Sequence, residues 1–268
     1  MVKNVNTEKM SIKDFTMNFF SLKGKVAIIT GGNSGLGQGF ALALAKAGAD
    51  IFAVSIADDN DETKKMIEAE GVKYHLMITD VTEVGACKQI AEECIHTYGK
   101  IDILMNNAGI CINEPDVTKF SRVQWDKMIS INLTAGFELS HEVAKYMIPQ
   151  KSGKIINTCS LFSYLGGQWS PAYAASKHGL AGFTKAYCDE LAQFNIQVNG
   201  IAPGYFATAV TAETRANPEA NQRILDHIPA NRWGNILDLM GTVVFLASDA
   251  SNYVNGTLVN VDGGYLVR

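Results

Sequence analysis

Short apolar runs alternate with amphipathic segments along most of this chain. The first run, Lys25–Thr30, has an apolar interior, which is typical of a strand buried on both faces of a parallel sheet. Six further runs predict strands over residues 50–56, 74–78, 101–105, 154–159, 196–201 and 258–261. The intervening segments repeat apolar residues at helical spacing, and they predict helices over residues 40–47, 62–70, 83–98, 121–148, 171–194 and 237–247.

This alternation of strands and helices predicts a fold of the α/β class. Right-handed crossovers between such units give a parallel sheet with helices on both faces. We therefore expect a single-domain, Rossmann-type doubly wound sheet of about seven strands. Ser121-x-x-Gln124 is a capping box that opens one of the two long helices.

The pattern loosens after the sixth strand. Residues 205–232 are rich in Ala, Thr, Glu and Asn without a long apolar stripe, and they predict a small helical lid. The chain shows no internal repeat, linker or low-complexity segment, so we expect one domain over residues 22–268. Residues 1–21 are expected to form an N-terminal arm, because they lack the apolar core of a secretory signal.

Composition narrows the class of protein further. A hydrophobic content of 47%, with 24 glycines and 6 prolines, is that of an ordinary globular protein. The net charge of −4 and the absence of a dense Lys/Arg run argue against a nucleic-acid partner or an anionic membrane surface. No window reaches the roughly 18 uncharged apolar residues of a membrane span.

The cysteines predict a cytoplasmic protein without a metal site. They are odd in number and scattered, no C-x-x-C pair occurs, and most have apolar neighbours in the sequence. This usage is typical of reduced core thiols. The five are Cys87, Cys94, Cys111, Cys159 and Cys188.

A glycine-rich turn follows the first predicted strand. It reads Thr30-Gly-Gly-Asn-Ser-Gly-Leu-Gly37 and leads directly into a helical pattern. In a strand–turn–helix unit of this kind, backbone N–H groups and the positive end of the helix face a phosphate. The spacing G-x-x-x-G-x-G differs from the usual G-x-G-x-x-G, and a structural turn is the alternative for the motif taken alone. The strand–helix units that follow it favour a dinucleotide site.

Tyr173 and Lys177 form a second candidate group together with Ser160. The first two stand four residues apart just after Ser170-Pro171, a helix start, so they share one helix face about 6 Å apart. A phenol titrates near ~10, and a neighbouring ammonium is expected to lower that pKa toward neutrality. Ser160 follows the fifth strand and is expected to reach the same point. The alternative is a half-buried helix tyrosine beside a solvated lysine, with Ser160 as a turn residue.

The polar motifs fall at the ends of the predicted strands. Ligands bind to sheets of this type at the carboxyl ends of the strands. The residues at such ends are Gly31, Asp80, Asn106, Ser160 and Pro203. We therefore expect the glycine turn and the tyrosine group to converge on one edge of the sheet.

The set of motifs resembles the short-chain dehydrogenase/reductase family from about Leu22 to the end of the sequence. Each motif is weak alone, but their order and spacing are specific. They are Thr30-Gly31-x-x-x-Gly35-x-Gly37, Asp80, Asn106-Asn107-Ala108-Gly109, Asn132, Ser160, Tyr173-x-x-x-Lys177, and Pro203-Gly204 with Thr208. The resemblance implies hydride exchange between nicotinamide C4 and a secondary alcohol or ketone.

The resemblance also implies roles for single residues. Tyr173 would be the general acid/base, Lys177 would lower its pKa and hold the nicotinamide ribose, and Ser160 would bind the substrate oxygen. Asn132 would hold a water of the proton relay; its alternative is to cap or bend a long helix. The implied cofactor-binding residues are Gly31, Asn33, Ser34, Gly35, Leu36, Gly37, Ser55, Asp80, Val81, Asn107, Ala108, Gly109, Tyr173, Lys177, Pro203, Gly204 and Thr208.

The end of the second strand predicts the choice of nicotinamide cofactor. Members of the resembled family that prefer NAD usually carry an acid at the position of Ser55, and this acid is missing here. The Arg or Lys that usually meets the 2′-phosphate of NADP is also missing. Asp58 and Asp59 would repel that phosphate. We therefore expect NAD, with NADP as the alternative.

The substrate is predicted to lie between the lid and residues 161–169. Aromatic and amide side chains there suit a sugar-like molecule, and lid arginines could meet a carboxylate, although packing and surface charge are equal alternatives. The candidates are Phe162, Gln168, Trp169, Tyr205 and Arg215, with Tyr164, Arg223 and Arg232 beside them.

Several segments resemble one bacterial branch of the family more closely. The branch contains 2-deoxy-D-gluconate 3-dehydrogenases, 2-dehydro-3-deoxy-D-gluconate 5-dehydrogenases and gluconate 5-dehydrogenases, which implies a sugar-acid substrate. The segments are residues 35–39, 228–234, 238–241, 243–248 and 253–256. A 3-oxoacyl-thioester reductase, a polyol dehydrogenase and a non-catalytic nucleotide-binding scaffold are the alternatives. The resemblance further implies a homotetramer assembled through the two long helices and the C-terminal segment.

Overall fold

The computed structural model describes residues 11–268, and the first ten residues of the predicted arm lie outside the described residues. Its centre is a seven-stranded sheet in the order β3-β2-β1-β4-β5-β6-β7. Every neighbouring pair is parallel. The strands are β1 (Val26–Thr30), β2 (Asp50–Ser55), β3 (Tyr74–Ile78), β4 (Ile103–Asn106), β5 (Gly153–Thr158), β6 (Ile196–Pro203) and β7 (Leu258–Val261).

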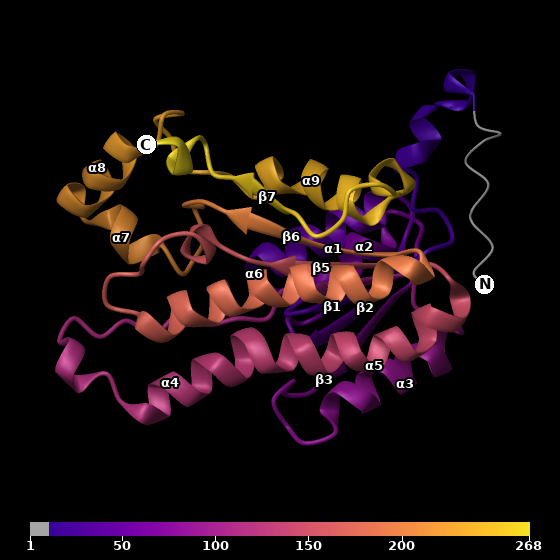
Figure 1. Cartoon of the computed structure of the whole chain (residues 1–268), viewed down its shortest axis with the longest axis horizontal. Coiled ribbons are helices and arrows are strands. Elements are labelled where there is room, and N and C mark those ends of the chain that lie inside the picture. Colours follow the sequence, from indigo (N-terminus) through magenta and orange to yellow (C-terminus); the bar gives the residue numbers. More distant parts are fainter. Residues whose placement is uncertain (1–10) are drawn as a thin grey trace.

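Helices cover both faces of this sheet (Figure 1). One face carries α1 and α9, which pack against each other, and the other carries α3, α5 and α6. The helices are α1 (Gly35–Lys46), α2 (Glu62–Glu68), α3 (Ala86–Tyr98), α4 (Arg122–Ile129), α5 (Ala135–Gln150), α6 (Pro171–Leu191), α7 (Ala212–Ala216), α8 (Pro218–His227) and α9 (Leu237–Ala247). The predicted fold class is confirmed.

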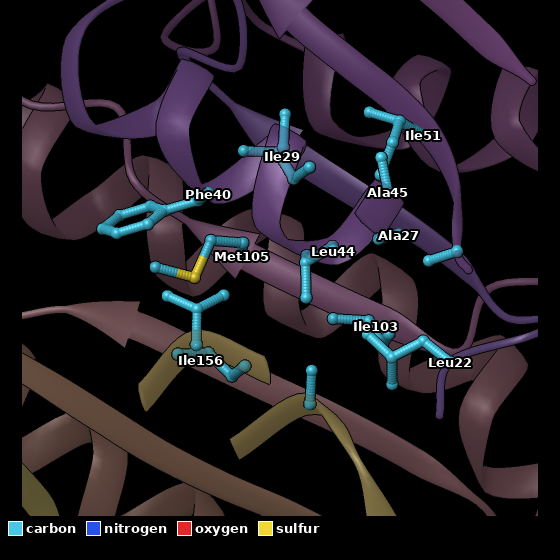
Figure 2. Packing of buried hydrophobic residues seen from close by; sticks show 14 of the residues in the cluster. Leu22, Ala27, Ile29, Phe40, Leu44, Ala45, Ile51, Ile103, Met105 and Ile156 are labelled. Carbon is cyan, nitrogen blue, oxygen red and sulfur yellow. The ribbon is translucent and has the colours of Figure 1, made fainter. Parts of the chain in front are cut away.

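Strand β1 is buried on both of its faces, which explains its consecutive apolar residues. Ala27 and Ile29 face the cluster around α1, which Figure 2 shows with Phe40, Leu44 and Met105. Val26 and Ile28 face the opposite cluster, beneath α3 and α5. Successive strand side chains point to opposite faces, so a strand covered on both sides needs an apolar residue at every position.

The order of the strands places a switch point between β1 and β4. The chain moves outward from β1 to β3 and then returns to lay β4 on the other side of β1. Thr30 joins the two strand ends, because its Oγ1 accepts the N–H groups of Asn107 and Ala108 at 2.9 Å each. The Asn107 side-chain amide donates to the Thr30 carbonyl, also at 2.9 Å. The crevice at such a switch point is where doubly wound sheets bind ligands.

Most predicted helices differ from the structure by a few residues at their ends, and the two long helices also differ in their course. The capping box at Ser121 is confirmed, but the helix predicted over residues 121–148 contains a π-helical turn, Ser130–Thr134, between α4 and α5. The helix predicted to end at residue 194 ends at Leu191, and a 3-10 turn follows. The helices α7 and α8 lie within the predicted lid. The division into an arm and a domain stays a prediction.

Candidate active site

The glycine turn between β1 and α1 forms an open cradle at the helix N-terminus. Gly31 and Gly35 have φ angles of +65° and +50°, values that favour glycine. A Cβ at Gly37 would lie 2.0 Å from the carbonyl oxygen of Gly31. The N-cap residue, Ser34, makes no side-chain hydrogen bond to the first turn of α1. The Ser34 side chain therefore leaves the first-turn N–H groups free to donate to a ligand, an arrangement that fits the pyrophosphate of a dinucleotide.

Ser160, Tyr173 and Lys177 are brought together beside this cradle. Lys177 lies one turn after Tyr173 on α6, with its Nζ 5.6 Å from the centroid of the Tyr173 ring. The same Nζ is buried and donates to the carbonyl of Thr158, the last residue of β5, at 2.6 Å. Ser160 opens a 3-10 turn, its Oγ accepts the N–H of Phe162 at 3.3 Å, and its hydroxyl is near enough to lower the pKa of Tyr173. The hydroxyls of Ser160 and Tyr173 and the amine of Lys177 thus lie close together at the edge of the sheet.

The acid–base properties of this group differ from the prediction. Burial raises the pKa of Tyr173 to about 12, and the hydrogen bond with Ser160 opposes that shift. Burial also lowers the pKa of Lys177 to about 8. The expectation that Lys177 draws the pKa of Tyr173 toward neutrality is therefore wrong for these residues as they lie here. The physical reason is that desolvation of the buried phenol is the largest effect on the pKa of Tyr173.

Asn132 occupies the π-helical turn and is buried. Its Oδ1 accepts the N–H of Ile110 and its Nδ2 donates to the C=O of Ile110, each at 2.8 Å. Nδ2 also donates to Ser176 Oγ on α6 at 3.3 Å. The amide therefore holds the loop after β4 against α6, and its acceptor and both donors are engaged within the protein.

Asn33 and Ser55 form a buried polar pair beyond the glycine turn. Asn33 Nδ2 donates to the carbonyl of Ala57 at 2.7 Å, which turns Oδ1 toward Ser55. Ser55 Oγ then donates to Asn33 Oδ1 at 2.5 Å. Of the two nearby acids, Asp59 accepts from the N–H and the hydroxyl of Thr63 in the first turn of α2. The only hydroxyl proton of Ser55 is thus committed, and its oxygen can act only as an acceptor.

The other predicted cofactor residues line the same edge. Asp80 accepts from the N–H and hydroxyl of Thr82 at 2.9 and 2.7 Å, and these bonds hold the pKa of its carboxyl below the ordinary value. Gly204 follows β6 and donates its N–H to Val261 at the end of β7. Thr208 begins the lid, with its N–H donated to the carbonyl of Phe206. Val81 is buried and Gly109 is exposed.

The candidate substrate residues divide into two groups. Phe162 contacts Tyr173 edge-on, with ring centroids 5.8 Å apart. Gln168 and Trp169 are exposed, and the Trp169 carbonyl accepts from Glu114 in the loop after β4. Three further candidates belong to the lid itself: Tyr205 contacts Trp233 and Tyr265, Arg215 donates to the Thr208 carbonyl, and Arg232 pairs with Asp238. Phe162 is thus in direct contact with the tyrosine group.

Cys111 was misjudged from the sequence. Cys87, Cys94 and Cys159 are buried, as predicted, and Cys188 is intermediate, but Cys111 is exposed. Its Sγ lies 3.7 Å from Ser170 Oγ, and its charge would act on both Tyr173 and Lys177. It therefore faces the site. The available signal was its position, two residues after Gly109 at the carboxyl end of β4.

Comparison with known proteins identifies the lineage. A family model described as short chain dehydrogenase matches residues 25–219. The chain belongs to the short-chain dehydrogenase/reductase family. This short-chain dehydrogenase/reductase is therefore an oxidoreductase that acts on CH–OH groups with NAD or NADP, as its motifs predicted.

Individual relatives cover nearly all of the chain. It is 68% identical over 96% of its length to the uncharacterized oxidoreductase YgcW of Escherichia coli (strain K12), of which 98% is covered. It is 45% identical over 94% of its length to the 2-dehydro-3-deoxy-D-gluconate 5-dehydrogenase of that strain, of which 99% is covered. A crystal structure of a gluconate 5-dehydrogenase from Burkholderia cenocepacia J2315 in complex with NADP and tartrate superposes with a TM-score of 0.89 at 36% identity, covering 94% of this chain and 98% of that one.

No helix within residues 11–268 has the length and apolar character needed to cross a membrane. The same residues contain no group of three His, Cys, Asp or Glu side chains arranged to hold a metal ion.

Proposed function

We propose that this enzyme exchanges hydride at a secondary alcohol of a sugar acid, such as a gluconate derivative. The observation that carries the proposal is the meeting of the Ser160 and Tyr173 hydroxyls beside buried Lys177, on the edge that carries the glycine cradle. The sugar-acid class is supported by relatives named as gluconate-type dehydrogenases, one of which holds tartrate, a small hydroxy acid.

The roles of the three side chains follow from their chemistry. When bound, the nicotinamide gives or accepts a hydride at C4. Ser160 Oγ and Tyr173 Oη hold the substrate oxygen between them, and Tyr173 transfers its proton. With a pKa raised to about 12, Tyr173 is protonated at neutral pH, so its phenol can donate to a ketone oxygen directly. Lys177 has N–H groups beyond the one donated to Thr158, and these can hold ribose hydroxyls.

We propose NAD as the preferred cofactor. Ser55 Oγ can only accept, because its proton goes to Asn33, so it fits a ribose hydroxyl better than a phosphate. Asp58 nearby adds a negative charge. The relative solved with NADP supports the alternative. Steady-state rates with both cofactors test this proposal, and a higher kcat/KM with NADP would overturn it.

A substrate panel tests the reaction class. Purified enzyme is mixed with sugar acids, polyols and 3-oxoacyl thioesters, each with NAD(H) and with NADP(H), and nicotinamide absorbance is followed. Turnover of one or more sugar acids is the expected result. Turnover of thioesters alone would replace the proposal with the acyl-reductase alternative, and turnover of neutral polyols alone with a polyol dehydrogenase.

We further propose a cytoplasmic homotetramer. Support for assembly comes from α5 and α6, where half-exposed Phe137 contacts the rings of Phe183 and Tyr187 on an outer face. The free state of all five thiols supports a reducing compartment. Light scattering coupled to gel filtration tests the assembly, and a monomeric mass would contradict it. Cell fractionation tests the location.

A further inference from the structure

The side chain of Asn106 has one buried oxygen without a partner. Asn106 Nδ2 donates to Ser140 Oγ and Asn157 Oδ1 at 2.9 Å each and to the Gly136 carbonyl at 3.3 Å. The Gly136 carbonyl can only accept, so this end of the amide must be the nitrogen. Asn106 Oδ1 therefore faces the other way, where it has no hydrogen-bond partner among residues 11–268. Buried carbonyl oxygens are rarely left unpaired in native proteins.

A small cavity lies against this part of the site. Its volume is about 10 Å³, close to the space that one water molecule requires. Its polar lining includes Asn106, Asn132, Thr158 and Lys177, and Gly136 contributes to its wall. A polar cavity of this size normally holds water, whereas apolar ones stay empty.

Asn132 is the less suitable side chain to hold a water here. Its oxygen already accepts from Ile110, and its nitrogen donates to Ile110 and Ser176. Asn106 Oδ1, in contrast, is an unused acceptor. On the donor side, Lys177 Nζ gives one N–H to Thr158 and has two more.

We propose that this cavity binds one water molecule, which donates to Asn106 Oδ1 and accepts from Lys177 Nζ. Asn106 is then a positioning residue that acts on Lys177 through the water. The side chain of Asn132 is then not required as a ligand of this water, because its amide holds the loop. The water site itself is independent of the reaction, while its effect on catalysis rests on the proposed function.

Gly136→Ala is the sharpest variant with which to test the site. A Cβ at Gly136 would lie 3.7 Å from Leu180 and 3.8 Å from Asn106 Cγ, ordinary contact distances, so the methyl fits without displacing the backbone. It would take space from the cavity while leaving Asn106 in place. Gly241→Ala on α9 is the matched control, because that glycine is exposed and its Cβ would meet nothing within 4 Å.

High-resolution crystal structures give the direct readout. In the wild type we expect an ordered water within about 2.7–3.2 Å of Asn106 Oδ1 and Lys177 Nζ. In Gly136→Ala we expect that water to be gone. A dry cavity in wild-type crystals that show other internal waters would overturn the proposal, whatever the substrate proves to be.

Thermal unfolding and a pH profile supply two independent readouts. Gly241→Ala should raise Tm by about 1–4 °C through helix propensity, and Gly136→Ala should fall short of that gain because Asn106 Oδ1 loses its partner. Equal gains would overturn the proposal.

Loss of the water should also move the alkaline limb of kcat/KM down by about one pH unit, because charged Lys177 loses an acceptor. An unmoved limb would remove the positioning role, whereas a wild type without turnover would count against the proposed function only.

Discussion

The side-chain amide of Asn132 makes two hydrogen bonds of 2.8 Å with the main chain of Ile110, one to its N–H and one to its carbonyl. One residue is in the π-helical turn between α4 and α5, and the other is in the loop that follows β4. That loop carries Gly109 on one side and the exposed Cys111 on the other. The pair therefore fixes the wall of the site that lies nearest to Lys177.

Replacing Asn132 by leucine should destabilise the protein by about 2–5 kcal/mol, because two main-chain groups of Ile110 lose their partners in a buried place. Urea unfolding followed by circular dichroism measures this loss. Asn113→Leu, at an exposed position of the same loop, is the control and should change stability by less than about 0.5 kcal/mol. Equal stability of the two variants would show that the Asn132–Ile110 hydrogen bonds contribute nothing to the free energy of unfolding.

Tyr173→Phe should lower kcat roughly 10²–10⁴-fold, because the ring still packs against Phe162 while the proton donor is gone. Binding of the cofactor, followed by fluorescence titration, should be nearly unchanged. Tyr253→Phe removes a hydroxyl from a fully exposed side chain and serves as the control. A Tyr173→Phe variant with wild-type turnover would disprove the assignment.

Gly37→Ala should abolish cofactor binding or unfold the turn. The added methyl would lie 2.0 Å from the Gly31 carbonyl oxygen and 2.5 Å from Asn107 Nδ2, and the first of these is a backbone atom that cannot rotate away. We expect the cofactor Kd to rise at least about tenfold, with a loss of stability of roughly 1–3 kcal/mol from overpacking. Calorimetric titration measures the Kd and urea unfolding measures the stability, each beside the Gly241→Ala control. A Kd within twofold of the wild type would contradict the geometry.

Lys154→Met should change the pH dependence of stability at the amino end of β5. Lys154 is buried, donates to Ser251 Oγ and Asn252 Oδ1, and has its pKa lowered by burial to about 8. Between pH 8 and 10.5 the unfolded chain holds a proton that the folded protein lacks, so this lysine makes the wild type gain stability as the pH rises.

The difference in unfolding free energy between wild type and Lys154→Met should therefore move in favour of the wild type by about 3 kcal/mol across that interval. Below pH 8 the difference should be flat. Guanidinium unfolding at fixed pH values measures it, and the subtraction removes the contributions of tyrosines and cysteines that both proteins share. A difference that falls with rising pH would contradict the sign.

Local patterns were sufficient for most of the fold. The apolar run of β1 required a strand covered on both faces, since Ile28 and Ile29 are adjacent and point to opposite clusters. The capping box at Ser121 marked a helix start that the structure confirms. A bend of the long helix at Asn132 was one of the two roles left open, but its bonding partner Ile110 could not be predicted because it is 22 residues away in the sequence.

The sequence by itself determined the strand–helix alternation, the glycine turn and the spacing of Tyr173 and Lys177, because these depend on the geometry of neighbouring residues. Only the tertiary structure decided their acid–base state. Burial opposes charge on both groups, so the pKa of Tyr173 rises to about 12 while that of Lys177 falls to about 8. It also decided that Ser55 gives its proton to Asn33 and that Asn106 Oδ1 is buried without a hydrogen-bond partner in residues 11–268. Desolvation and hydrogen-bond choice depend on which distant segments close around a group, and no local pattern records that.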